Sequence, residues 1–156
     1  MKITQLGKEL SKDKYVIDLK AKSFSTTEDN LVLDFSDEHR WGFKTGSYCT
    51  FNTGSNCTFN TGYNCTFDTG YYCTFNTGSN CTFNTGSNCT FDTGYYCTFN
   101  TDYYCTFKTG SECVAVRRDI YEVIEIPKGK TIRLNGYGVK GYVAVEEPEP
   151  DLVKKL

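Results

Sequence analysis

Cysteine recurs every eight residues, nine times in succession, from Cys49 to Cys113. The octet that it heads reads Cys-Thr-Phe-Asn-Thr-Gly-Ser-Asn, with few substitutions. Residues 49–72 and 73–96 differ at a single position, where Tyr63 corresponds to Ser87. Eight residues match no helical period, and a glycine in nearly every octet would destabilise a helix. The repeat therefore constrains the chain to a stack of short, non-helical units.

Each octet has the pattern of one short strand and one turn. Counted from the cysteine as position one, Cys-Thr-Phe alternates apolar and polar side chains, which indicates a strand with one buried face. Asn-Thr-Gly-Ser-Asn is typical of a turn, and we expect the glycine at position six to supply a positive φ. In one octet that glycine is replaced by Asp102, and Asp also tolerates the left-handed region.

A single octet buries one Phe and one Cys, which is too little to offset the entropy of ordering eight residues. Stacking solves this, because strands of successive coils can pair in parallel about 4.8 Å apart. The sequence therefore predicts an all-β fold, a parallel β-solenoid with inner ladders of Phe and Cys. Two octets per coil, or 16 residues, is the favoured arrangement. A 24-residue coil fits the duplicated block but would stack Asp68 on Asp92.

The octet frame extends beyond the cysteines at both ends. Trp41-Gly42-Phe43 fits the slots of Cys-Thr-Phe, and Leu33-Asp34-Phe35 fits them one octet earlier. Downstream, Tyr121 keeps the phase. We assign the solenoid to residues 33–123, with a regular core over 41–113. Degenerate end repeats are expected of a stacked array, whose last units face water.

The flanking segments predict caps and a tail. Residues 1–32 are expected to form an N-terminal cap, with a short helix near Gln5–Leu10 and a strand at Tyr15–Leu19. Residues 124–145 are expected to form a C-terminal β cap, and 146–156 a flexible, Pro-rich tail. Strands are expected at Glu122–Ile126, Thr131–Leu134 and Gly141–Val145, with a turn at 127–130. Caps matter because an open solenoid end is an unpaired edge.

The cysteines are best explained as core residues. A disulfide framework is disfavoured because nine is odd and the N-terminus lacks the apolar core of a secretory signal. Zinc sites use closely spaced cysteine pairs, which a gap of seven residues does not resemble. We expect small, buried, reduced thiols that fill space beside Phe. The sequence predicts no metal and no cofactor.

No pattern in the chain indicates catalysis. His39, the only histidine, follows Asp37, but no nucleophile motif accompanies them. No phosphate-binding loop or dinucleotide fingerprint is present. We therefore expect a non-enzymatic protein.

Two sets of polar and aromatic residues are candidate binding surfaces. Tyrosine is enriched in interface hot spots, and three pairs of tyrosines lie at the ends of turns. These are Tyr71, Tyr72, Tyr95, Tyr96, Tyr103 and Tyr104. The alternative surface is a series of outward threonines that resembles the Thr arrays of ice-binding proteins: Thr50, Thr58, Thr66, Thr74, Thr82, Thr90, Thr98 and Thr106. Position four holds Asn, Asp or Lys, not the second Thr of those proteins, and Thr also simply suits an exposed strand.

Charge argues against nucleic acid as a partner. The formal net charge is −2, whereas a solenoid that mimics DNA needs dense acidic side chains. On the C-terminal cap, a modest basic patch is conceivable, but nearby acidic residues largely offset it. The basic residues are Arg117, Arg118, Lys128, Lys130 and Arg133, and the acidic residues are Asp119, Glu122 and Glu125. The sequence contains no run of eighteen apolar residues, so it does not predict a membrane span. The expected location is the cytosol.

The octets resemble repeats of uncharacterised bacteriophage, prophage and bacterial proteins. The resemblance covers residues 41–118 and includes the step out of the array through Val114-Ala115-Val116-Arg117-Arg118-Asp119. It implies an octapeptide-repeat β-solenoid of phage, prophage or bacterial origin, which would be virion-associated if a phage encodes it. It brings no activity with it.

Three functions follow as hypotheses. The leading one is a rigid solenoid scaffold or interaction module for an unknown protein partner, with end-to-end or edge self-association as a variant of it. The second is binding to ice or another ordered surface through the Thr and Asn ladders. The third is inhibition of a nucleic-acid enzyme by shape mimicry.

Overall fold

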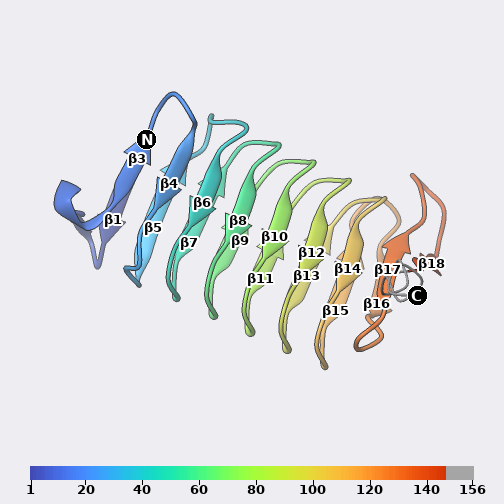
Figure 1. Cartoon of the computed structure of the whole chain (residues 1–156). Helices are drawn as coiled ribbons and strands as arrows, with labels where there is room; N and C mark the ends of the chain where they lie inside the picture. The colour runs from blue at the N-terminus through green and yellow to red at the C-terminus, as the bar shows by residue number, and fades with distance from the viewer. Residues whose placement is uncertain (147–156) are drawn as a thin grey trace, which may run out of the picture.

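The computed structural model describes residues 1–146 as a β-solenoid of stacked coils with two sheets of nine strands each (Figure 1). In spatial order, the first sheet contains β2 (Lys8–Glu9), β1 (Lys2–Gln5), β5 (Leu31–Phe35), β7 (Thr50–Thr53), β9 (Thr66–Asp68), β11 (Thr82–Asn84), β13 (Thr98–Thr101), β15 (Val114–Arg117) and β16 (Glu122–Glu125). The second contains β3 (Val16–Asp18), β4 (Ser23–Ser25), β6 (Gly42–Lys44), β8 (Thr58–Asn60), β10 (Thr74–Asn76), β12 (Thr90–Asp92), β14 (Thr106–Lys108), β17 (Thr131–Leu134) and β18 (Tyr142–Ala144). A 3-10 turn, η1 (Lys12–Lys14), precedes β3.

Each coil contains two octets, as predicted. Successive octets alternate between the sheets, so Thr66 pairs in parallel with Thr50 and Thr82, each 16 residues away. Asp68 lies in the first sheet and Asp92 in the second, which removes the charge repulsion that a 24-residue coil would create. The 24-residue alternative is wrong.

The parallel stack extends from β4 and β5 to β15. At its N-terminal end the frame slips, because Leu33 pairs with Phe51 and so lies in the Phe column. The expectation that Leu33 fills a cysteine slot was therefore wrong. The turn between β5 and β6 is two residues longer than an octet frame allows, and it absorbs the slip.

Antiparallel strands cover both ends of the stack. The short helix expected near Gln5–Leu10 is absent, since β1 and β2 form a hairpin there and β1 also pairs with β5. Pairing along the sheet outweighs the weak helical pattern of that segment. The strands expected in the C-terminal cap are present as β16, β17 and β18. The tail expected over 146–156 lies outside the described residues, except for its first residue.

The core consists of the predicted ladders of Phe and Cys. Phe67 stacks on Phe83 at 4.9 Å between ring centroids and at 4° between planes, and it meets Phe75 of the facing sheet edge-on at 5.1 Å. Offset-stacked and T-shaped pairs are the favoured aromatic geometries. Every Phe of these ladders and every Cys is at most 3% exposed.

The glycine at position six is required by a close approach rather than by its φ. None of these glycines has a positive φ, so the sequence-based assignment was wrong on this point. A Cβ on Gly62 would lie 2.1 Å from Ser47 Oγ. That hydroxyl accepts a hydrogen bond from the Tyr63 backbone N–H at 3.1 Å. Because glycine has no side chain, it leaves room at position six for the serine of the preceding coil.

The left-handed backbone lies instead at position eight. Asn56, Asn80 and Asn88 have φ values of 60–61°. Residues of other types at position eight share this conformation. Asn is among the few L-residues that adopt it readily, because its short polar side chain can hydrogen-bond locally. Position eight of the octet is therefore the residue that reverses the chain.

Asp102 replaces glycine for a reason that the sequence did not reveal. Its carboxylate forms an ion pair with Arg118 at 3.2 Å. In the coil beneath it, Ser87 Oγ accepts a hydrogen bond from Asn88 Nδ2 at 3.1 Å. The Ser87 hydroxyl thus accepts a hydrogen bond from a different donor than the serines of other coils do, and the Asp side chain is tolerated.

Candidate binding surface

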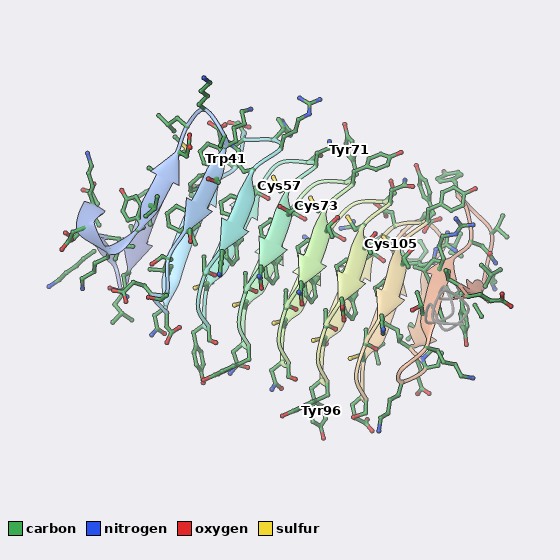
Figure 2. All side chains as sticks on the ribbon, viewed as in Figure 1. Trp41, Cys57, Tyr71, Cys73, Tyr96 and Cys105 are labelled. Carbon is green, nitrogen blue, oxygen red and sulfur yellow. The ribbon has the colours of Figure 1, made fainter. Side chains whose placement is uncertain are left out.

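The turns of the solenoid form two opposite edges. Turns that lead from the first sheet to the second make the first edge, and turns that lead back make the second edge. Figure 2 shows Tyr71 on one edge and Tyr96 on the other. Because each coil contains two octets, neighbouring octets always place their turns on opposite edges.

The six tyrosines of the candidate binding surface are divided between these edges. Tyr71, Tyr72, Tyr103 and Tyr104 lie on the first edge, whereas Tyr95 and Tyr96 lie on the second. Two further tyrosines of the second edge, Tyr48 and Tyr63, are 51% and 52% exposed and were missed. They come from octets that lack a Tyr-Tyr pair, so the pair pattern did not find them.

Four of the edge tyrosines occupy the left-handed position eight. Tyr48, Tyr72, Tyr96 and Tyr104 have φ values of 57–59°. The left-handed conformation costs an L-residue roughly 1–2 kcal/mol. Asn fills the same position in other octets at lower cost. These tyrosines are nevertheless 45–58% exposed, so burial does not account for their presence.

Contacts between tyrosines hold their rings in place. Tyr71 and Tyr72 meet edge-on with ring centroids 5.7 Å apart, and Tyr95 and Tyr96 do so at 5.4 Å. On the second edge Tyr48 meets Tyr63 of the next coil at 5.5 Å. T-shaped pairs contribute about 0.5–1.5 kcal/mol beyond burial, which orders these side chains before any partner arrives.

Three contacts hold the Tyr104 side chain, and two of them come from the C-terminal cap. The guanidinium of Arg133 lies 5.6 Å from the ring centroid, a cation–π distance. Tyr103 meets the Tyr104 ring at 5.8 Å. A Cβ on Gly136 would lie 2.7 Å from Tyr104 Oη, so the cap backbone packs directly against this ring.

An open groove of about 440 Å³ lies beside this ring on the first edge. Its lining is mixed in chemistry and consists of Tyr72, Asn88, Thr90, Tyr104, Thr106 and Arg133. The two tyrosines come from coils that are two apart, and Asn88 belongs to the coil between them. The groove therefore offers aromatic rings, hydroxyls, an amide and one positive charge.

The alternative threonine surface is also divided in two. Thr50, Thr66, Thr82 and Thr98 form an in-register column on the first sheet. Thr58, Thr74, Thr90 and Thr106 form a column on the second. Each column is bounded at its ends by other residue types, among them Val32 and Val114 on the first sheet.

All nine cysteines are free, buried thiols in two ladders. The backbone N–H of Cys49 donates to Sγ of Cys65 at 3.4 Å. Hydrogen bonding to the Cys105 thiol, with burial, raises the pKa of Cys89 to about 12, whereas hydrogen bonding to Cys65 lowers the pKa of Cys49 to about 7. Within residues 1–146 no cluster of three or more His, Cys, Asp or Glu is arranged to hold a metal ion.

His39 has a structural role. Its Nδ1 accepts a hydrogen bond from the Ser55 backbone N–H at 2.8 Å. On the opposite edge Asp29 Oδ1 accepts from the Ser47 N–H at 2.7 Å. Both side chains replace the serine hydroxyl that performs this task between later coils, such as Ser55 toward Tyr71. The first coil is thus anchored by residues that lie outside the octet pattern.

The two arginines considered for a basic patch on the C-terminal cap are paired with carboxylates, and for Arg117 the partner is Asp119, as expected. Arg117 is fully buried, and its guanidinium binds the Asp119 carboxylate at 2.6 Å and the Gly136 carbonyl at 3.0 Å. Arg118 is held by Asp102 and by the Asn84 side chain. Arg117 ties the last coil to the cap, whereas Arg118 ties the last coils to one another. The buried charge of Arg117 must be paired in this way.

Comparison with family models, curated proteins and solved structures found no match for this chain. No helix in the described part of the chain is long and apolar enough to cross a membrane.

Proposed function

We propose that this protein is a non-enzymatic scaffold that binds a protein partner through the tyrosines of its edges. One observation carries the proposal: exposed tyrosines occupy left-handed positions that Asn fills elsewhere in the same array. Residues kept in unfavourable backbone conformations are concentrated at functional sites. Tyrosine also buries a large area with few rotors, which suits it to anchor an interface.

The fold supports a scaffold role by keeping these side chains at fixed distances. In-register parallel pairing sets the separation of successive coils, and the Phe ladders fill the space between the sheets. Antiparallel strands cover the parallel stack at both ends, which limits uncontrolled addition of further strands. A partner that spans several coils would therefore meet a rigid row of anchors.

The edges supply specificity that the faces lack. Thr recurs at the same position of every central strand, so one coil of a face is like the next. The tyrosines interrupt this uniformity at particular coils, and specificity requires such differences. The resemblance of the octets to phage and prophage repeats favours a phage-derived partner or a host protein that a phage encounters, in a reducing compartment such as the cytosol.

The test uses two edge variants with substitutions taken from other octets. One carries Tyr71→Ser and Tyr72→Asn on the first edge, and the other carries Tyr95→Ser and Tyr96→Asn on the second. Each is used as bait in a lysate of the natural host, and captured proteins are identified and rebound in purified form. We expect at least one variant to lose more than tenfold in affinity. Thr66→Ser and Thr82→Ser on a sheet face serve as the control.

Two outcomes would contradict the proposal. If both edge variants together retain full affinity for the captured partner, the edges are not the interface. If the protein instead shows thermal hysteresis that Thr74→Tyr or Thr90→Tyr removes, the ordered-surface hypothesis replaces it.

A further inference from the structure

The interior of the solenoid shows how rings stack on successive coils. Phe67, Phe83 and Phe99 belong to three consecutive coils of the first sheet. Their ring centroids are separated by 4.9 Å and 4.8 Å, and their planes are within 9° of parallel. The coil spacing thus equals a favourable distance between stacked rings.

The position-eight column of the first edge follows the same spacing but has a gap. Tyr72, Asn88 and Tyr104 belong to three consecutive coils, with rings in the outer two and an amide in the middle one. Two coil spacings separate the outer residues, about 9.7 Å by the Phe ladder. A ring inserted over Asn88 would lie roughly 4.9 Å from each tyrosine, within the 4.5–7 Å range of aromatic pairs.

A positive charge lies at the end of this groove. Arg133 lines it together with both tyrosines, and its guanidinium packs on Tyr104. No carboxylate among residues 1–146 lies within ion-pair distance of Arg133. The neighbouring Arg118, by contrast, is paired with Asp102. Among residues 1–146, the groove therefore combines a place for a ring with a cation that no carboxylate pairs.

We infer that this groove receives an aromatic side chain of a protein partner, with an acidic residue next to it in the partner sequence. The ring inserts between Tyr72 and Tyr104 above Asn88, and the carboxylate pairs with the Arg133 guanidinium. Arg is suited to this role because it binds carboxylates with two parallel hydrogen bonds. The inference rests on the proposed function and specifies the partner's chemistry.

A protein segment fits the groove better than a free aromatic acid. The groove is open and lies on a turn edge, whereas sites for small molecules typically enclose most of the ligand surface. Affinity in an open groove must come from contacts along a longer chain. Tyr71 and Tyr103, adjacent to the groove on the same edge, are available for those contacts.

The first experiment uses short peptides as probes. The peptide Gly-Asp-Phe-Glu-Gly, blocked at both ends, is titrated into the full chain and followed by backbone amide shifts in NMR spectra. We expect shifts centred on Asn88, Thr90 and Thr106. Replacing Phe by Leu in the peptide should weaken binding at least tenfold. Replacing its acids by Asn and Gln should weaken it severalfold and remove its dependence on salt.

The second experiment fills the gap in the column. Asn88→Tyr supplies the missing ring from the protein itself and should abolish peptide binding without unfolding the chain, since tyrosine is accommodated at position eight in four other octets. Asn80→Tyr makes the same change on the second edge and should leave binding unchanged. Arg133→Gln should remove the preference for acidic peptides.

Several outcomes would overturn the inference. Unchanged binding to Asn88→Tyr would show that the gap is not the site, and equal binding of the Leu peptide would show that no ring is recognised. If benzoate binds as tightly as the peptide, the ligand is a small aromatic acid rather than a protein. If no peptide binds while the edge variants still lose their captured partner, the inference fails and the proposed function stands.

Discussion

At the scale of single residues, positions six and eight of the octet are subject to different structural constraints. Position six must be small because the position-seven residue of the previous coil lies against it, as Ser47 does at Gly62. Position eight must accept a left-handed backbone but is free to point its side chain outward. The first demand restricts the sequence, whereas the second leaves a site that can vary in chemistry at a known energetic cost.

The cost at position eight can be measured at Glu112, which is exposed and has a φ of 61°. Because Asn tolerates this conformation better than Glu, Glu112→Asn should raise the free energy of unfolding by about 1 kcal/mol. Urea unfolding followed by circular dichroism measures the change. The matched reversal, Asn56→Glu at the same φ, should lower it by a similar amount. A destabilising Glu112→Asn would contradict the role assigned to position eight.

The demand at position six can be tested at Gly62. Gly62→Ala places a methyl group against Ser47 Oγ and should cost about 1–3 kcal/mol, as overpacking does elsewhere. In a Ser47→Ala background the cost should fall by at least about 0.5 kcal/mol, which a double-mutant cycle detects. Gly78→Ala, whose Cβ would lie 3.0 Å or more from its neighbours in Tyr63 and Gly62, should be the milder control. Additive effects at Gly62 and Ser47 would refute the contact.

At the scale of the strand, the ladders explain why so short an element suffices. A three-residue strand such as β11 contributes one Phe and pairs with a strand on each side. Its thiol neighbour Cys81 lies in the same core and is 1% exposed. No octet is stable alone, but each buries its apolar side chains against the octets before and after it.

The ladders predict how the thiols react. All nine should be unreactive toward a thiol reagent in the native protein and reactive after denaturation, because each is at most 2% exposed. Cys49 is the sharpest case, since its lowered pKa favours the thiolate while burial denies the reagent access. Thiol titration with and without denaturant gives both counts. Rapid labelling of native Cys49 would show that the N-terminal coil opens.

The sequence predicts strands well where the octet repeats and less well where it stops. The alternation of Cys-Thr-Phe identifies every central strand to within one residue, since the strands begin at the Thr and include the residue after Phe. The position of Asp68 relative to Asp92 distinguishes the 16-residue coil. The positive φ was wrongly assigned to position six instead of position eight, because Gly and Asn both accept a left-handed φ. The contact of Arg133 with Tyr104 depends on the antiparallel return of β17, which no local pattern indicates.

At the scale of the whole molecule, the coil relates distant residues by simple counting. Residues separated by 16 or 32 positions share an edge, as Tyr72 and Tyr104 do. Residues separated by 24 face opposite ways, as Tyr72 and Tyr96 do. The caps depend only on the coils next to them, because β17 pairs with β14 and β16 with β15.

Removing one octet tests this rule. Deletion of residues 57–64 and deletion of residues 89–96 should both give folded, cooperatively unfolding solenoids of lower stability, since each octet is replaced in the stack by a similar one. The first deletion keeps residues 72 and 104 on one edge, whereas the second moves them to opposite edges. Binding of the aromatic acidic peptide should therefore survive only the first. Unfolding of both variants would show that the octets are not interchangeable.

The near-identity of residues 49–72 and 73–96 has a consequence for how such a repeat can change. Three octets are one and a half coils, so duplicating a three-octet block inserts a copy that faces away from its template, just as the tyrosines of 71–72 recur at 95–96 on the other side. One such duplication creates a second, opposed display instead of extending the first. Only an even number of added or lost octets preserves the orientation of everything downstream. Whether a mutation changes the number of octets by an odd or an even count therefore determines on which edge the downstream side chains lie.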